Sequence, residues 1–151
     1  MDDCYYMKLA LEQAQLAAKQ QEIPIGAVLV KEDKVIAHAH NMRETWQDGT
    51  AHAEIIVIQQ ACKILHSWRL TGCTLYVTVE PCPMCAGALI MSRIDRLVYG
   101  CADSKAGASE SLFNITNNPQ LNHRLQVTAG VCETECREIM RNFFANKRSK
   151  K

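Results

Sequence analysis

Hydrophobic and polar residues repeat along the chain with two different periods, which predict both helices and strands. Between residues 5 and 19 the apolar side chains recur three or four positions apart, so this segment is predicted to be an amphipathic helix. The runs from Ile25 to Val30 and from Val35 to Ala39 are short and apolar, and polar residues separate them. These two runs are predicted to form a β-hairpin.

Beyond residue 50, long apolar segments alternate with short ones, which predict helices and strands respectively. The predicted helices are 51–65, 83–92 and 133–147, and the predicted strands are 74–79, 97–100 and 125–128. Residues 102–123 are rich in Ala, Ser, Gly and Asn, and predict a loop long enough to be functional or mobile. Because helices and strands alternate, we expect an α/β sandwich with helices on both faces of the sheet.

The overall composition is that of an ordinary globular protein. With 151 residues, 48% of them hydrophobic and 22% charged, the chain is predicted to form a single domain over residues 1–151. Its apolar runs are far shorter than the roughly 20 residues that span a bilayer. The first residues, Met1-Asp2-Asp3, lack the basic and apolar stretches of a secretory signal. We therefore expect a cytoplasmic protein that does not enter a membrane.

The net charge of +1 indicates no polyanionic partner, but the C-terminal end of the chain is basic. From residue 137 onward there are six basic residues and one acidic residue, in a helix predicted over about 133–151. The basic residues are Arg137, Arg141, Lys147, Arg148, Lys150 and Lys151. They are either solvated cations that suit the negative end of a helix dipole, or a surface that contacts nucleic acid.

Two short motifs, His-Ala-Glu at 52–54 and Pro-Cys-Pro-Met-Cys at 81–85, carry the candidate chemistry. Cys82 and Cys85 are three residues apart at the predicted start of a helix, so their sulfurs share one face at the positive end of the helix dipole. His52 begins another predicted helix and supplies a third ligand. Three ligands of this kind predict a zinc site with its fourth position open to water. Glu54 does not share a helix face with His52 and is predicted to carry protons instead.

Two other interpretations of these motifs remain open. In the first, the zinc site is closed and structural, with a fourth ligand from among Cys62, Cys73, Cys101, His38, His40, His66 and His123. Structural sites usually contain paired motifs, whereas this chain has one Cys-x-x-Cys. In the second, the two cysteines are a redox dithiol, which leaves the His-Ala-Glu motif unexplained. The other six cysteines are interpreted as buried thiols, with Cys132 and Cys136 on one helix face.

Longer stretches of the chain, together with these motifs, resemble the zinc-dependent nucleoside and base deaminase superfamily. The stretches are IPIGAVLV at 23–30, HN at 40–41, TAHAE at 50–54, TLYVTVEPC at 74–82, MCAGALIMSRI at 84–94 and NHR at 122–124. They extend over nearly the whole chain. Within the superfamily, the chain resembles the bacterial tRNA adenosine deaminases, which convert a wobble adenosine of the anticodon to inosine.

The resemblance implies a cytidine deaminase-like fold, a three-layer α/β/α sandwich with a central five-stranded mixed sheet, in a homodimer. It implies one Zn²⁺ per chain, held by His52, Cys82 and Cys85, with Glu54 as the catalytic acid and base. The implied partner is the anticodon stem-loop of a tRNA, whose target base is flipped into the pocket. The implied reaction is hydrolytic deamination of adenosine.

The resemblance also implies substrate contacts by Asn41, Asp103, Asn122, His123, Arg124, Phe144 and Arg148. Simpler interpretations exist for each kind of residue. Asn41 suits a turn after a strand, and loop residues such as Arg124 are often only solvated. Core packing is expected for at least one ring of the Phe143-Phe144 pair.

Two positions depart from the pattern of the tRNA enzymes. Pro83 stands where a small aliphatic residue is usual, and Pro-Cys-Pro-Met-Cys also occurs in guanine deaminases. Glu110 replaces a common glycine and is expected to add negative charge beside the RNA-binding loop. Two alternatives to the tRNA activity follow: a deaminase of free guanine or cytosine, and a non-catalytic zinc module that binds RNA.

Overall fold

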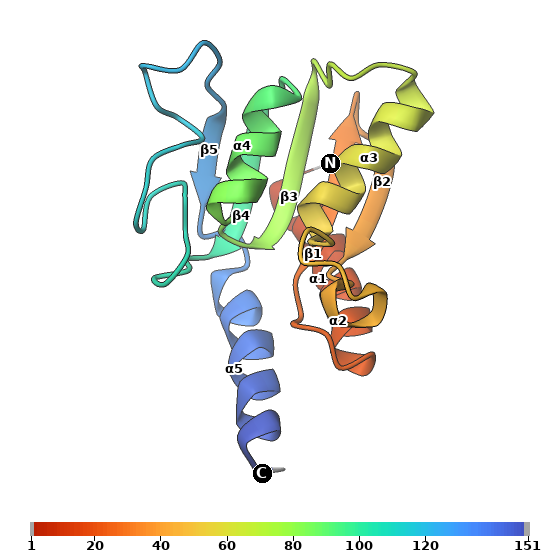
Figure 1. Cartoon of the computed structure of the whole chain (residues 1–151), viewed down its shortest axis with the longest axis vertical. Helices are drawn as coiled ribbons and strands as arrows, with labels where there is room; N and C mark the ends of the chain where they lie inside the picture. Colours follow the sequence, from red (N-terminus) through yellow and green to blue (C-terminus); the bar gives the residue numbers. More distant parts are fainter. Residues whose placement is uncertain (1, 150–151) are drawn as a thin grey trace.

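A computed structural model of the chain describes residues 2–149. In chain order the elements are α1 (Asp3–Lys19), β1 (Gly26–Lys31), β2 (Lys34–His40), α2 (Arg43–Trp46), α3 (Ala53–Leu65), β3 (Cys73–Val79), α4 (Pro83–Met91), β4 (Arg96–Cys101), β5 (Gln126–Ala129) and α5 (Glu133–Ser149). The strands form one sheet in the order β2-β1-β3-β4-β5 (Figure 1). Strand β1 runs antiparallel to both β2 and β3, whereas β3, β4 and β5 are parallel. The predicted five-stranded mixed sheet is therefore confirmed.

Helices cover both faces of the sheet, because alternate residues along each strand point to opposite sides. On one face, Leu75 and Val77 of β3 pack in a hydrophobic cluster with residues of α3 and α4. On the other face, Val28 and Tyr76 pack with residues of α1 and with Cys136 of α5. The chain therefore forms the predicted sandwich of three layers (Figure 1).

Two glycines allow helices to lie close to the sheet. A Cβ atom at Gly26 would collide with the backbone of α1 at Ala10 and Ala14. A Cβ atom at Gly100 would collide with the thiol of Cys136 and with the carbonyl oxygen of Thr78. The first glycine fits α1 against β1, and the second fits the start of α5 against β4.

The parallel strands place the connections that follow β3 and β4 at the same edge of the sheet. Helix α4 starts just after β3 at this edge, and α3 starts close by (Figure 1). The long segment 102–125 leaves β4 here and returns to the start of β5 at the opposite edge without forming a helix or strand. Beyond β5, α5 extends past the sheet (Figure 1).

Several local predictions need correction. The short helix α2 was not predicted, because its four residues carry no apolar period. Of the six cysteines interpreted as buried, Cys4 is exposed, and Cys62 and Cys132 are only partly buried. Cys132 precedes α5 with a positive φ of 53° and is not on a helix face with Cys136.

The C-terminal aromatic pair also differs from the prediction. Among the described residues, neither Phe143 nor Phe144 joins a hydrophobic core cluster, and both rings are half-buried. The rings meet edge to face, with their centroids 5.3 Å apart. Lys150 and Lys151, which were predicted to extend this helix, lie outside the described residues. No helix within residues 2–149 has both the length and the apolar character to cross a membrane.

Candidate active site

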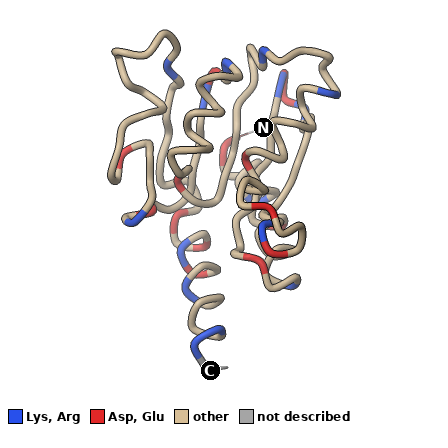
Figure 2. Tube along the Cα trace, in the orientation of Figure 1, with Lys and Arg blue, Asp and Glu red and all other residues tan. Residues whose placement is uncertain are grey.

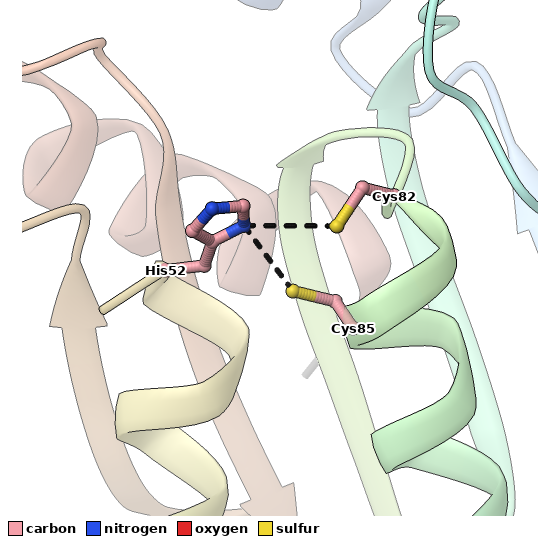
Figure 3. Close-up of side chains that lie close together, drawn as sticks. All are labelled: His52, Cys82 and Cys85. Atoms are coloured by element: carbon pink, nitrogen blue, oxygen red, sulfur yellow. Dashed lines mark hydrogen bonds between the residues drawn. The ribbon is translucent and has the colours of Figure 1, made fainter. Parts of the chain in front are cut away.

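The N-termini of α3 and α4 bring His52, Cys82 and Cys85 together at the edge where β3 and β4 end. His52 is the N-cap residue of α3 and Cys82 is the N-cap residue of α4, while Cys85 lies in the first turn of α4. Pro83 occupies the first position of α4, where a missing N–H has no helical partner to lose. His52 Nδ1 lies 3.7 Å from Cys82 Sγ and 3.5 Å from Cys85 Sγ (Figure 3).

These separations fit a tetrahedral zinc ion. Zinc bonds of about 2.3 Å to sulfur and about 2.0–2.1 Å to nitrogen place tetrahedral S and N ligands about 3.6 Å apart. The ligand atoms of His52, Cys82 and Cys85 all lie within 4.8 Å of one another, and in the part of the chain that is described the potential metal-binding group consists of these three residues. The donor set thus fits zinc with a position left for water, and it gives no support to a closed structural site.

Hydrogen bonding and charge distinguish the two thiols. The hydrogen bond from Cys85, followed by that from His52, lowers the pKa of Cys82 to about 4 despite burial. The same bond to Cys82, with burial, raises the pKa of Cys85 above its usual value. The hydrogen bond with Cys82 also raises the pKa of His52. Cys82 is therefore a ready thiolate ligand, and Cys85 must release a proton to become one.

Glu54 lies beside this cluster in the first turn of α3. It is 4% exposed, and burial is the main reason that its pKa is raised to about 7. A carboxyl group with a pKa near neutrality can both accept and donate a proton under working conditions. The side chain predicted as a proton carrier therefore has the environment that this role requires.

A cavity of about 610 Å³ opens above Glu54 and the cluster. Part of its lining is formed by loop residues that include Asp103, and another part is formed by α5, which contributes Phe144 and several arginines. The arginines are Arg137, Arg141 and Arg148. Along α5, acidic residues gather near the start and basic residues near the end (Figure 2). The cavity therefore combines a buried carboxyl group with a positively charged wall.

Asn41 is also placed at this site. It is 4% exposed and lines a recess of about 50 Å³ together with His52 and Glu54. Its side-chain oxygen accepts a hydrogen bond from the N–H of Arg43 at 3.4 Å, and its own N–H donates to Ile25. Asn41 can therefore both stabilise the turn after β2 and lie at the predicted position beside the substrate.

Asp103 and Glu110 are both tied to the protein. The Asp103 Oδ1 atom accepts hydrogen bonds from the N–H groups of Lys105 and Ala106, at 3.0 and 3.1 Å, while the residue lines the cavity. Glu110 accepts a hydrogen bond of 2.7 Å from the hydroxyl of Tyr99 in β4. The negative charge that Glu110 was expected to add beside the RNA-binding loop therefore has a partner within the protein.

The segment Asn122, His123 and Arg124 lies away from the cluster in this chain. It precedes β5, whose first residue pairs with the first residue of β4, at the opposite edge of the sheet. His123 Nε2 lies 2.7 Å from the carbonyl oxygen of Ile94, and Asn122 and Arg124 are exposed. The structure thus does not bring these predicted contact residues to the candidate active site.

Two buried carboxylates near the site escaped sequence analysis. Glu22 accepts hydrogen bonds from the N–H groups of Glu44 and Thr45 and from the Thr45 hydroxyl, which fixes α2 beside the cluster. Glu80 ends the buried run of β3 and binds the loop that follows β4. For Glu80, the sequence offers one indication of burial: a glutamate directly follows the apolar strand segment 75–79.

Comparisons with known proteins agree with this geometry. A model of the MafB19-like deaminase family matches residues 1–148. The tRNA-specific adenosine deaminase of Bacillus subtilis (strain 168) is 50% identical over 149 residues, which cover 99% of this chain and 92% of that protein.

Solved structures show the same relationship. One from a study of A-to-I editing by tRNA:A34 deaminases has a TM-score of 0.86 and 47% identity, and the match covers 89% of this chain and 98% of that one. A guanine deaminase from Bacillus subtilis has a TM-score of 0.66 and 33% identity, with 83% of each chain covered. The chain therefore belongs to the deaminase family that includes the bacterial tRNA-specific adenosine deaminases.

Proposed function

We propose that this chain is a zinc-dependent hydrolase that converts adenosine to inosine at the wobble position of a tRNA anticodon. The observation that carries the proposal is the placement of buried Glu54 beside the His52, Cys82 and Cys85 cluster, at the base of a cavity with an arginine-rich wall. The names of its relatives support adenosine in tRNA as the substrate. The homodimer and the cytoplasmic location stay predictions.

His52, Cys82 and Cys85 would hold the zinc ion. When bound with an open fourth position, zinc lowers the pKa of water and so makes a nucleophile available near neutral pH. Glu54 accepts the proton that the attacking water loses at C6 of adenine. It delivers this proton to N1, then takes the remaining proton of the hydroxyl that has bonded to C6 and passes it to the departing amine, which leaves as ammonia. The raised pKa of Glu54 suits both halves of this transfer.

The remaining residues of the cavity bind and orient the nucleotide. Asn41, in the recess next to Glu54, can donate to and accept from a base edge or a ribose through its amide. Arg141 and Arg148 can pair with backbone phosphates. An unpaired loop base can enter such a cavity because little stacking energy is lost. These contacts are the reason to prefer an RNA loop to a free base as the substrate.

Substrate choice gives the first test of the proposal. We expect inosine and ammonia from an anticodon stem-loop with adenosine at the wobble position, and much slower ammonia release from free adenosine, guanine and cytosine. The comparison is made at equal base concentration, with a stem-loop carrying guanosine at the wobble position as the control.

The guanine deaminase alternative has a specific basis in the shared Pro-Cys-Pro-Met-Cys motif and in the likeness to the Bacillus subtilis guanine deaminase. Rapid ammonia release from guanine, with no inosine in the stem-loop, would support that alternative and reject the tRNA proposal. Zinc binding with no release from any of these substrates would support the non-catalytic module.

The basic wall gives a second prediction. Changing Arg141 and Arg148 together to alanine should weaken stem-loop binding and lower the slope of log affinity against log salt by about two, roughly one for each lost phosphate contact. Binding is measured between low and moderate salt by fluorescence anisotropy. Lys63→Ala on α3 is the control, because Lys63 is exposed on the opposite face of the sheet. An unchanged slope in the double variant would show that these arginines do not bind phosphate.

A further inference from the structure

The carboxylate of Glu80 is an unusually crowded hydrogen-bond acceptor. Glu80 is 3% exposed, and its oxygens accept from the N–H groups of Asp103 (3.0 Å), Ser109 (3.1 Å), Glu110 (2.8 Å) and Ser111 (2.9 Å), and from the Ser111 hydroxyl. Burial opposes its ionisation, but these bonds outweigh burial and lower the pKa to about 2. Glu80 is therefore a buried anion that main-chain N–H groups solvate.

These bonds gather one stretch of the loop around the end of β3. The N–H of Ala108 also donates to the carbonyl of Pro81 at 2.8 Å, next to the carboxylate. Gly107 lies so close that a Cβ atom there would overlap the Glu80 carboxylate. Segment 102–125 contains no helix or strand, so its N–H groups are satisfied by backbone bonds of its turns and by side-chain acceptors such as Glu80.

The anchored stretch is also a wall of the cavity. Residues 102–106 line the cavity together with residues of α5, and Asp103 is the one among them whose N–H is bound by Glu80. Asp103 in turn holds the N–H groups of Lys105 and Ala106. A displacement of Asp103 would therefore move the whole wall relative to the arginines of α5.

We propose that Glu80 is a positioning residue of the deaminase, which holds residues 103–106 in the conformation that receives the nucleotide. The proposal rests on the function proposed above, and it identifies Glu80 as the residue that fixes the part of the cavity lining formed by residues 103–106. Glu80 acts through Asp103 and takes no part in proton transfer. Its removal should therefore affect substrate binding more than the chemical step.

Glu80→Gln makes the sharpest change. The Oε2 atom of Glu80 accepts hydrogen bonds from three N–H groups, so the NH₂ group of a glutamine cannot take its place. The NH₂ group therefore occupies the Oε1 position, where the Ser111 hydroxyl can turn and accept a hydrogen bond from it. The N–H of Asp103 then loses its acceptor. We expect the KM for the stem-loop to rise about tenfold, as for a lost hydrogen bond to a charged group, with kcat changed less than about threefold.

Amide hydrogen exchange supplies a readout that does not depend on activity. In Glu80→Gln, exchange at Asp103 should accelerate by at least about tenfold, while amides in the middle of α3 keep their protection. Zinc content is measured on the same samples, because Glu80 lies two residues from Cys82. Asp3→Asn is the control: this carboxylate is partly buried and accepts hydrogen bonds from Arg96, at the opposite end of β4 from the cavity.

Two further variants act on the same anchor at a distance from the zinc ligands. Gly107→Ala should displace the Glu80 carboxylate, and Ser111→Ala removes its hydroxyl donor. Both should raise KM in the same direction as Glu80→Gln, with the larger effect from Gly107→Ala. They carry the test if Glu80→Gln does not fold.

The outcomes separate the two proposals. Loss of zinc and a fall in kcat with constant KM would show that Glu80 supports the metal site, and unchanged exchange at Asp103 would show that it does not anchor the wall. Either result overturns the positioning role. If the unmodified protein makes no inosine, the proposed function fails, whereas exchange still reports whether Glu80 holds the loop.

Discussion

Cys82→Ser is expected to abolish zinc binding and inosine formation together. The Cys82 sulfur is the thiolate of the cluster, with a pKa of about 4, and lies 3.7 Å from His52 Nδ1. A serine hydroxyl stays protonated near neutral pH and is a poor zinc ligand. Since loss of a residue that only supports a ligand costs about 10- to 100-fold in metal affinity or activity, the loss of a ligand itself should exceed this range.

Zinc per chain is measured by mass spectrometry of metals after dialysis, and inosine is measured by single-turnover assay. Cys62→Ser is the matched control, because Cys62 is a partly buried thiol whose Sγ lies 3.9 Å from the carbonyl oxygen of Trp68, outside the cluster. The control should keep its zinc and its activity. Full zinc content and normal turnover in Cys82→Ser would refute the proposed metal site.

Glu54→Gln is expected to retain zinc and lose turnover. Glutamine keeps the size and much of the hydrogen bonding of the glutamate but cannot carry a proton. The rate of the chemical step should fall by about 10²- to 10⁴-fold, the usual contribution of a general acid or base. Binding of the stem-loop should change little, because the variant removes no positive charge.

The chemical step is followed in single turnovers with enzyme in excess, alongside zinc content and stem-loop affinity. Glu110→Gln is the control, since the Glu110 side chain lies in the loop after β4, accepts a hydrogen bond from the Tyr99 hydroxyl and is not among the residues that line the cavity. The control should remain active. A Glu54→Gln enzyme that turns over at a normal rate would rule out Glu54 as the proton carrier, whatever the fate of the zinc.

The sheet and the metal cluster were predictable because local patterns encode them. The apolar run of β1 is unbroken and that of β3 is interrupted only by threonines, and the His-Ala-Glu and Cys-Pro-Met-Cys motifs each stand at the beginning of an apolar helix. A helix start fixes where its first side chains point, so two such starts at one sheet edge were enough to form the cluster. The spacing of Glu54 from His52 indicated only that Glu54 is not a ligand of the same ion, and the resemblance implied its role as acid and base.

What the sequence did not reveal depends on contacts between distant residues. Glu80 acts on residues 23 to 31 positions further along the chain, with no period to mark the pairing. The prediction that Cys4 is buried was wrong because a thiol in the first turn of α1 can lie on either the buried or the exposed face of the helix. At least one ring of the Phe143-Phe144 pair was expected to pack in the core, but neither belongs to a core cluster of the described residues, and α5 extends past the sheet (Figure 1).

Under the proposed function, the spacing of the arginines along α5 sets how long a substrate must be to contact all of them. Arg137 and Arg148 are eleven positions apart, with Arg141 between them, which is about 16 Å along a helix that rises 1.5 Å per residue. A single purine cannot reach from the base of the cavity to every one of these cations, whereas a chain of several linked phosphates can. If the cavity receives the proposed tRNA substrate, length as well as chemical identity would distinguish the polymer from its monomers.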